Sequence, residues 1–196
     1  MNSWFHRVLP RAILASLGPL LTLGVAGCSK KESFSEPPAK SAAPAREKPL
    51  AVGDPAPDFE AVAHDGSHVR LRDLRGKAVV LYFYPKDGTP GCTTEAQAFR
   101  DEQAAIERAQ AVVLGISADD NQSHRHFAEE HGLPFLLLPD TEHSLARAYG
   151  VGSFLGMPSR VTYLIDRQGR VARVYPNVDP NHHAAEILRD LSQLPP

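Results

Sequence analysis

The chain has 196 residues, 42% of them hydrophobic and 22% charged, and a formal net charge of −2 at pH 7. This hydrophobic fraction is typical of a globular protein and argues against a chain that is disordered throughout. The near-neutral charge, with no basic face and no block of like charges, argues against nucleic acid as a partner.

The first 27 residues are typical of an export signal. Arg7 and Arg11 form a positive segment without acids, and the apolar stretch Ala12–Ala26 follows. This stretch is too short to span a bilayer comfortably. The small residues of Val25-Ala26-Gly27-Cys28 resemble a bacterial lipobox. We expect cleavage before Cys28 and a lipid on its sulfur; the alternatives are a plain secretory signal with an accidental cysteine, or an uncleaved anchor.

Residues 28–50 are expected to carry the lipid and to form a disordered tether. The stretch Ser29–Leu50 is rich in Lys, Ser, Ala and Pro, and Phe34 is its single aromatic residue. Such a composition cannot bury enough apolar surface to offset the entropy lost on ordering. The expected product is an exported lipoprotein that is anchored to a membrane and faces the periplasm. Ser29, in place of the Asp that retains lipoproteins at the inner membrane of enteric bacteria, slightly favours the outer membrane.

Residues 51–196 fit one domain in which strands alternate with helices, which predicts an α/β fold. It opens with a hairpin of Phe59–Val62 and Val69–Leu71 that turns at His64-Asp65-Gly66. Four nearly continuous apolar runs predict strands that are covered on both faces: Ala78–Tyr84, Ala111–Ser117, Phe135–Leu138 and Val161–Asp166. The predicted helices are Cys92–Ala109, Asn121–His131, Asp140–Tyr149 and Asp179–Leu194.

Two further features complete the predicted domain. The turn Arg167-Gln168-Gly169 joins the last of these strands to Arg170–Tyr175 in a second hairpin. The closing helix Asp179–Leu194 is expected to turn an apolar face inward, made of Ala184, Ala185, Ile187, Leu188 and Leu191.

Cys92 is the only cysteine of the predicted domain, and it follows a loop rich in proline and glycine, Pro85–Gly91. A helix is expected to begin at this cysteine. Unpaired backbone N–H groups and the positive end of the helix dipole would then favour the thiolate, which is the reactive form of cysteine. The alternative is a buried structural cysteine, but the polar surroundings favour a reactive one.

This loop resembles the active site of the peroxiredoxins, in which a Pro, a Thr or Ser and the peroxidatic Cys stand at the spacing of Pro85, Thr89 and Cys92. The longer segment from Tyr82 to Glu95 resembles the branch of bacterioferritin comigratory protein, also called peroxiredoxin Q. The similarity extends from about Gly53 to Leu194. It implies a thioredoxin-like fold, with a central mixed sheet covered by helices on both faces and an N-terminal β-hairpin. It also implies a peroxidase for hydrogen peroxide or organic hydroperoxides that needs no cofactor.

The resemblance assigns roles to the loop residues. Cys92 would attack a peroxide oxygen and become a sulfenic acid. Thr89 would offer its hydroxyl to the thiolate or the peroxide, and Gly91 would let backbone N–H groups approach the reacting oxygens. Pro85 would shield the pocket, although ending the preceding strand is an equally good explanation for a proline there.

Arg160 and Glu95 are the expected charged residues of the site. Arg160 matches the family position just before a core strand, where its permanent charge would stabilise both the thiolate and the transition state. Taken alone, an arginine at the start of a strand is ordinary surface. Glu95 follows Cys92 by one helical turn and is expected to orient Arg160, although an acid in the first turn also suits the helix dipole.

The chain departs from the family at the position of the resolving cysteine. Many members of this branch have that cysteine five residues after the first, where this chain has Gln97. Cys28 could serve only if it were not lipidated. We therefore expect a single-cysteine peroxidase that is reduced by an external thiol, such as a thioredoxin-like protein. The protein is expected to be a monomer, with a Cys92–Cys92 dimer possible on oxidation.

Two other kinds of function remain as alternatives. A thiol–disulfide oxidoreductase normally needs Cys-x-x-Cys, and Glu95 occupies the second position. A non-catalytic thioredoxin-like lipoprotein could bind a partner or a metal instead. The histidine pairs at 124 and 126 and at 182 and 183 lack metal-ligand spacing, so no metal is predicted and these side chains are expected on the solvated surface.

Overall fold

The computed structural model describes residues 48–195. The predicted export signal, Cys28 and most of the tether lie outside the described residues. Leu50, which we assigned to the tether, is described, and it is buried in the core with 2% of its surface exposed. Within this described stretch, no helix is both long enough and apolar enough to cross a membrane.

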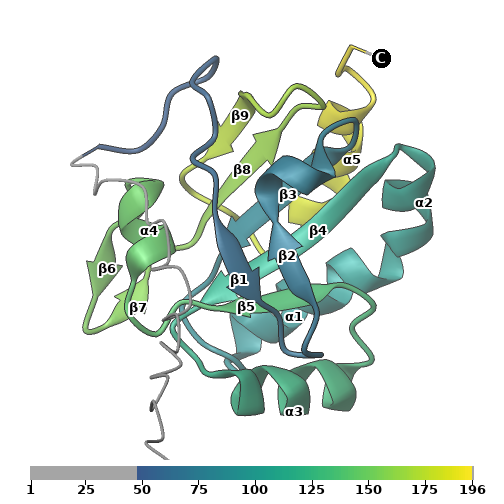
Figure 1. Cartoon of the computed structure of the whole chain (residues 1–196). Coiled ribbons are helices and arrows are strands. Elements are labelled where there is room, and N and C mark those ends of the chain that lie inside the picture. Colours follow the sequence, from purple (N-terminus) through teal and green to yellow (C-terminus); the bar gives the residue numbers. More distant parts are fainter. Residues whose placement is uncertain (1–47, 196) are drawn as a thin grey trace, which may run out of the picture. The chain divides into compact units, whose positions relative to one another are not determined.

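A mixed five-stranded sheet, in the order β5-β4-β3-β8-β9, forms the centre of the domain (Figure 1). Strands β3, β4 and β5 run parallel to one another, whereas β8 and β9 are antiparallel to their neighbours. The five strands are Ala78–Phe83, Ala111–Ser117, Leu136–Pro139, Val161–Ile165 and Val171–Tyr175, in the order β3, β4, β5, β8 and β9. All five agree with the predicted strands to within one residue at either end.

Both faces of the sheet are buried, because side chains alternate along each strand. From β3, Val79, Leu81 and Phe83 enter one core cluster, and Val80 and Tyr82 enter the other. The second cluster lies under the helices α1 (Pro90–Asp101), α2 (Gln103–Arg108), α3 (Asn121–His131) and α5 (His183–Leu191). The first is covered by the hairpin of β1 (Glu60–Val62) and β2 (His68–Arg70), by the 3₁₀ turn η1 (Leu71–Leu74) and by α4 (Ser144–Ala148).

The two predicted hairpins are confirmed. β1 pairs with β2 around a turn that contains Gly66 at φ +88°, and β8 pairs with β9 around Gly169 at φ +78°. Both glycines have a positive φ that few other residues adopt without strain. A third, very short hairpin of β6 (Ser153–Phe154) and β7 (Met157–Pro158) was not predicted, because two-residue strands carry no periodic signal.

The first predicted helix, Cys92–Ala109, is wrong in its bounds. It begins earlier, at Pro90, whose ring suits the first helical position because no N–H is needed there. It also breaks at Glu102, whose φ and ψ of −95° and 3° lie outside the helical region. The break separates α1 from α2, and both Phe99 and Ile106 are fully buried on the same side of the sheet.

The helix predicted at Asp140–Tyr149 is shorter than expected, because Asp140 precedes the helix and binds its first turn through the side chain. The Asp140 carboxylate accepts hydrogen bonds from the backbone N–H groups of Leu145 and Ala146, at 3.0 and 2.8 Å. His143, with φ +55°, ends the intervening turn, and α4 begins at Ser144. A side chain that accepts such bonds competes with the helical backbone and therefore precedes the helix.

The closing helix is also shorter than predicted. Asp179 forms a turn in which its side chain accepts hydrogen bonds from Asn181 and His182, and α5 begins only at His183. Ala184, Ile187 and Leu191 face the core as expected, and Leu188 is partly buried against it. Ala185 is exposed, contrary to the prediction.

Of the four histidines predicted to lie on the surface, two are exposed and two are buried. The side chains of His126 and His182 are 81% and 82% exposed, as expected. His124 and His183, however, are buried, with 0% and 1% of their surface exposed. Each is held by a polar partner inside the protein, Asp87 for His124 and Thr162 for His183.

Candidate active site

Cys92 lies in the first turn of α1, at its third residue, and is a free thiol with 1% of its surface exposed. Thr89 occupies the N-cap position without a side-chain hydrogen bond to the helix, and Pro90 has no N–H. The amide groups of Gly91 and Cys92 therefore belong to the group of helix N–H donors that lack a carbonyl partner within the helix. The sulfur lies at the positive end of the helix, which favours a negative charge on it.

Strand pairing brings Arg160 to this thiol from 68 residues away in the sequence. In the antiparallel register of β3 and β8, Val161 stands opposite Phe83. Arg160 therefore lies beside the end of β3, where the loop to α1 begins. Its Nη2 donates a hydrogen bond to Sγ of Cys92 at 3.1 Å. A guanidinium in this position stabilises negative charge on the sulfur.

Glu95 holds the other nitrogen of the same guanidinium. Nη1 of Arg160 donates to Oε2 of Glu95, whose side chain is fully buried. Burial raises the pKa of Glu95 to about 7, and the opposing effect of Arg160 does not cancel this rise. Burial disfavours the charged guanidinium, but Glu95 and Cys92 together raise the pKa of Arg160 above its usual value. The cation is therefore shared between a sulfur and a carboxyl group.

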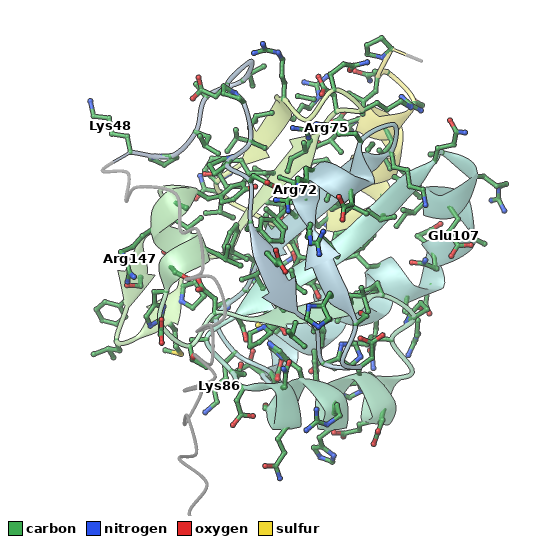
Figure 2. The ribbon with its side chains drawn as sticks, viewed as in Figure 1. Lys48, Arg72, Arg75, Lys86, Glu107 and Arg147 are labelled. Atoms are coloured by element: carbon green, nitrogen blue, oxygen red, sulfur yellow. The ribbon has the colours of Figure 1, made fainter. Side chains whose placement is uncertain are left out.

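The remaining predicted residues surround this pair. An added Cβ at Gly91 would lie 3.4 Å from Nη2 of Arg160, so the glycine leaves room beside the guanidinium. Thr89 lies on the loop, but its hydroxyl donates to the carbonyl of Lys86 at 3.1 Å and not to the thiol. The predicted hydrogen bond from Thr89 to the thiolate or the peroxide is therefore absent from this arrangement. Pro85 is half-buried at the start of the loop, and Lys86 lies at the surface beside α3 (Figure 2).

A buried set of hydrogen bonds around Asp87 anchors the loop and was not predicted. The Asp87 carboxylate accepts from the hydroxyls of Tyr84 and Ser123 at 2.7 and 2.8 Å, and it contacts Nδ1 of His124 at 2.9 Å. Its backbone N–H donates to Asp119 at 2.9 Å. Burial opposes the charge, but the bonds from His124, Tyr84 and Ser123 hold the pKa of Asp87 below its usual value. The sequence gives little signal for this set, because its members come from three separate elements.

Gln97, at the position of a resolving cysteine, is directed to another part of the domain. Its Nε2 lies 3.5 Å from Nδ1 of His131, at the end of α3. Among the described residues, Cys92 is the only cysteine. No intramolecular disulfide can therefore form within this part of the chain.

Residues 48–195 hold no candidate metal site, and their groove is separate from the thiol. No group of three or more His, Cys, Asp or Glu side chains is arranged to hold a metal ion there. A groove of about 810 Å³ lies among β2, η1, α2 and the edges of β4 and β5. None of the predicted site residues lines this groove, so it is separate from the thiol.

Comparisons with known proteins find relatives over most of the described residues. Residues 52–174 match the model of the AhpC/TSA family. Peroxiredoxin Bcp of Bacillus subtilis is 43% identical over 153 residues, which are 74% of this chain and 97% of that protein. The chloroplastic peroxiredoxin Q of Gentiana triflora is 40% identical over 166 residues, 83% of this chain and 76% of that protein.

A solved structure gives the same result for the fold. The crystal structure of peroxidoxin BcpB from Mycobacterium tuberculosis matches with a TM-score of 0.70 at 33% identity, over 75% of this chain and 99% of that one. The predicted thioredoxin-like fold is thereby confirmed. The matched family segment contains Cys92, Arg160 and the loop between β3 and α1. The chain therefore belongs to the peroxiredoxins, as a thiol peroxidase of the branch of bacterioferritin comigratory protein and peroxiredoxin Q.

Proposed function

We propose that this peroxiredoxin reduces hydroperoxides by a single-cysteine mechanism, with Cys92 as the peroxidatic residue. The observation that supports this most directly is the 3.1 Å hydrogen bond from Arg160 to the Cys92 sulfur in the first turn of α1. The thiolate attacks the hydroxyl oxygen of the hydroperoxide, an S–O bond forms and the O–O bond breaks. The sulfur is oxidised to a sulfenic acid, and the leaving alkoxide or hydroxide takes up a proton to become an alcohol or water.

An external thiol then restores Cys92. A first thiol attacks the sulfenic sulfur, releases water and forms a mixed disulfide with Cys92. A second thiol attacks the sulfur of the first, so that Cys92 is released as a thiol and the two reductant thiols end as a disulfide. Gln97 supports this route, because it occupies the position of the internal partner and has no sulfur. A thioredoxin-like protein in the periplasm would be a suitable reductant. Because Cys92 is only 1% exposed, a protein reductant would require the first turn of α1 to open.

The sequence before the domain supports a location for this activity. We propose that the chain is exported, cleaved before Cys28 and lipidated there, and that it acts at a membrane facing the periplasm. The test is metabolic labelling with a fatty acid, followed by separation of membrane from soluble proteins. The wild type should be labelled and sediment with membranes, and a Cys28→Ala variant should lose the label. An unlabelled, soluble wild-type protein would contradict the proposal.

The test of the catalytic proposal follows Cys92 directly. A chain beginning after Cys28 is reduced and mixed with one equivalent of hydrogen peroxide, and its intact mass and free thiol are followed over time. We expect rapid gain of one oxygen at Cys92, reversal by added thiol, and no gain in a Cys92→Ser variant. If Cys92 reacts no faster than free cysteine, the peroxidase proposal is wrong, and a non-catalytic lipoprotein becomes the better explanation.

A further inference from the structure

His183 is a buried titratable side chain beside the active site to which the proposed peroxidase mechanism gives no role. It begins α5, and its Nε2 lies 2.9 Å from the hydroxyl of Thr162 on β8. The rings of Phe99 and Tyr175 meet its imidazole edge to face, with centroids 5.4 and 5.2 Å away. These contacts fix the orientation of the ring, because a rotation would cost both the hydrogen bond and the aromatic packing.

The same nitrogen faces the free side of Glu95. Oε2 of Glu95 contacts Arg160, whereas Oε1 is buried and has no hydrogen-bond partner among the described residues. Nε2 of His183 lies 3.9 Å from this Oε1. This distance is too long for a hydrogen bond, but both side chains are fully buried, so neither group is screened from the other by water.

The surroundings of the opposite nitrogen of His183 favour one position for the imidazole proton. Nδ1 lies 3.8 Å from the carboxylate of Glu186, a side chain that is 43% exposed, and within the described part of the chain this nitrogen is buried without a closer hydrogen-bond partner. A proton on Nδ1 is favoured by that negative charge. Nε2 then accepts from the Thr162 hydroxyl and has no N–H to offer to Oε1 of Glu95, 3.9 Å away. An ionised Oε1 would then be buried without a donor from residues 48–195, which favours a proton on Oε1.

We propose that His183 is a positioning residue that keeps a proton on Oε1 of Glu95, so that the charge of Arg160 is directed to the Cys92 thiolate. The inference rests on the proposed role of Cys92 as the reacting thiol. A neutral Glu95 still accepts the hydrogen bond from Arg160 and holds the guanidinium in place. An ionised Glu95 would compete with the thiolate for the same cation and would repel it as a second negative charge.

The charges around the pair are consistent with this assignment. Burial lowers the pKa of His183 to about 4, and Arg160 adds to that effect, whereas burial raises the pKa of Glu95 to about 7. The proton shared by this pair therefore belongs on the carboxyl group. The titratable groups that face it come from α1, β3, β9, α5 and the residue before β8: Cys92, Tyr82, Tyr175, Glu186 and Arg160.

The experiment compares the pH dependence of Cys92 alkylation by iodoacetamide in the wild type, His183→Gln, Glu95→Gln and the double variant. For each protein, the alkylation rate near pH 6 is divided by the plateau rate at high pH. Differences in access to the sulfur affect both rates equally and cancel in this ratio. The glutamine at 183 can turn an N–H toward Oε1 and favour its ionisation. We expect the ratio to fall about tenfold, the effect of a one-unit shift in a titration. In Glu95→Gln the ratio should not respond to the change at 183.

Exposed His182 provides the matched control, because His182→Gln alters the neighbouring residue without touching Glu95. Two measurements on the wild type do not require the His183 variant to fold. Nitrogen NMR of His183 should show the proton on Nδ1, and infrared spectroscopy near pH 6 should show a protonated carboxyl band that Glu95→Gln removes. A proton on Nε2, or no such band, overturns the inference.

The failure of this inference is distinguishable from the failure of the proposed function, because alkylation requires no peroxide. A coupled response of His183 and Glu95 in a protein that hydrogen peroxide does not oxidise would support the inference and refute the peroxidase mechanism. Rapid oxidation by peroxide together with equal alkylation ratios in the wild type and His183→Gln would refute the inference alone.

Discussion

At the scale of single residues, Arg160 is the group on which the site depends. One of its terminal nitrogens donates to Cys92 and the other to Glu95. Only a planar guanidinium offers two such donors in a fixed arrangement, whereas a lysine ammonium is a single flexible point charge. The side chain is only 18% exposed, so its interactions are weakly screened by solvent. The contact with Glu95 therefore fixes the direction in which Arg160 presents its other donor.

The prediction for Arg160→Lys follows from this geometry. The variant keeps the positive charge but cannot contact both partners in the same way, so we expect oxidation of Cys92 by hydrogen peroxide to slow by about 10²–10³-fold, as for loss of one preorganised donor. The rate is measured by stopped mixing and mass analysis. Arg147→Lys on exposed α4 is the control, and it should not change the rate (Figure 2). An unaltered rate in Arg160→Lys would show that charge alone is sufficient.

At the scale of elements, the loop between β3 and α1 is held in place mainly through Asp87. Tyr84 at the end of β3 and two residues of α3, Ser123 and His124, contact its carboxylate. Its N–H is held by Asp119, which follows β4 and also accepts from the Ser117 hydroxyl. Three elements therefore determine where the loop leaves the sheet. Because the loop leads directly into the first turn of α1, these bonds also determine where Cys92 lies.

Asp87→Asn tests this anchoring. The NH₂ group that replaces one carboxylate oxygen is a donor, and it would face the donors that now bind the carboxylate. We therefore expect the free energy of unfolding to fall by about 1–3 kcal/mol. Because the loop would move, oxidation of Cys92 should slow as well. Urea unfolding and the peroxide reaction measure the two effects. Asp65→Asn is the control, since Asp65 holds only the exposed hairpin turn through Ser67. Equal effects of the two variants would contradict a special role for Asp87.

At the scale of the whole molecule, two buried groups beside the active site make stability depend on pH in opposite directions. Folding raises the pKa of Glu95 from 4.5 to about 7, so its contribution to stability is fully present below pH 4.5 and is lost as the pH rises to 7. Folding lowers the pKa of His183 from 6.5 to about 4, so the unfolded chain takes up a proton first, and stability is lost as the pH falls between these values.

Replacing Glu95 should change how the free energy of unfolding depends on pH. In Glu95→Gln the loss of stability with rising pH is absent. We therefore expect the free energy of unfolding of this variant to increase relative to that of the wild type between about pH 5 and pH 8. Urea unfolding at fixed pH values measures the difference. Glu107→Gln, on the exposed surface of α2 (Figure 2), should show no such trend. A constant difference between Glu95→Gln and the wild type would mean that Glu95 ionises normally.

Much of the fold could be predicted from the sequence because strands buried on both faces leave a direct signal. Four of the five core strands are nearly continuous apolar runs and β9 alternates, and the bounds of all five agree with the structure to within one residue. Helix ends were predicted less well. Asp140 and Asp179 look like helical residues in a periodic pattern, but their side chains accept local hydrogen bonds and delay the start of α4 and α5. Such competition depends on local geometry that periodicity does not contain.

The sequence by itself determined the residues of the reacting loop and the absence of a second cysteine near Cys92. Local chain order is sufficient for these, since the loop, the cap and the first turn of α1 are contiguous. The resemblance already pointed to Arg160, but only the tertiary structure decided how distant side chains are arranged around this thiol. The antiparallel register that sets Val161 opposite Phe83 brings in Arg160, and the packing of α5 against α1 places His183 near Glu95. Burial then changes the charges of these groups, because removing water makes each depend on the partner beside it.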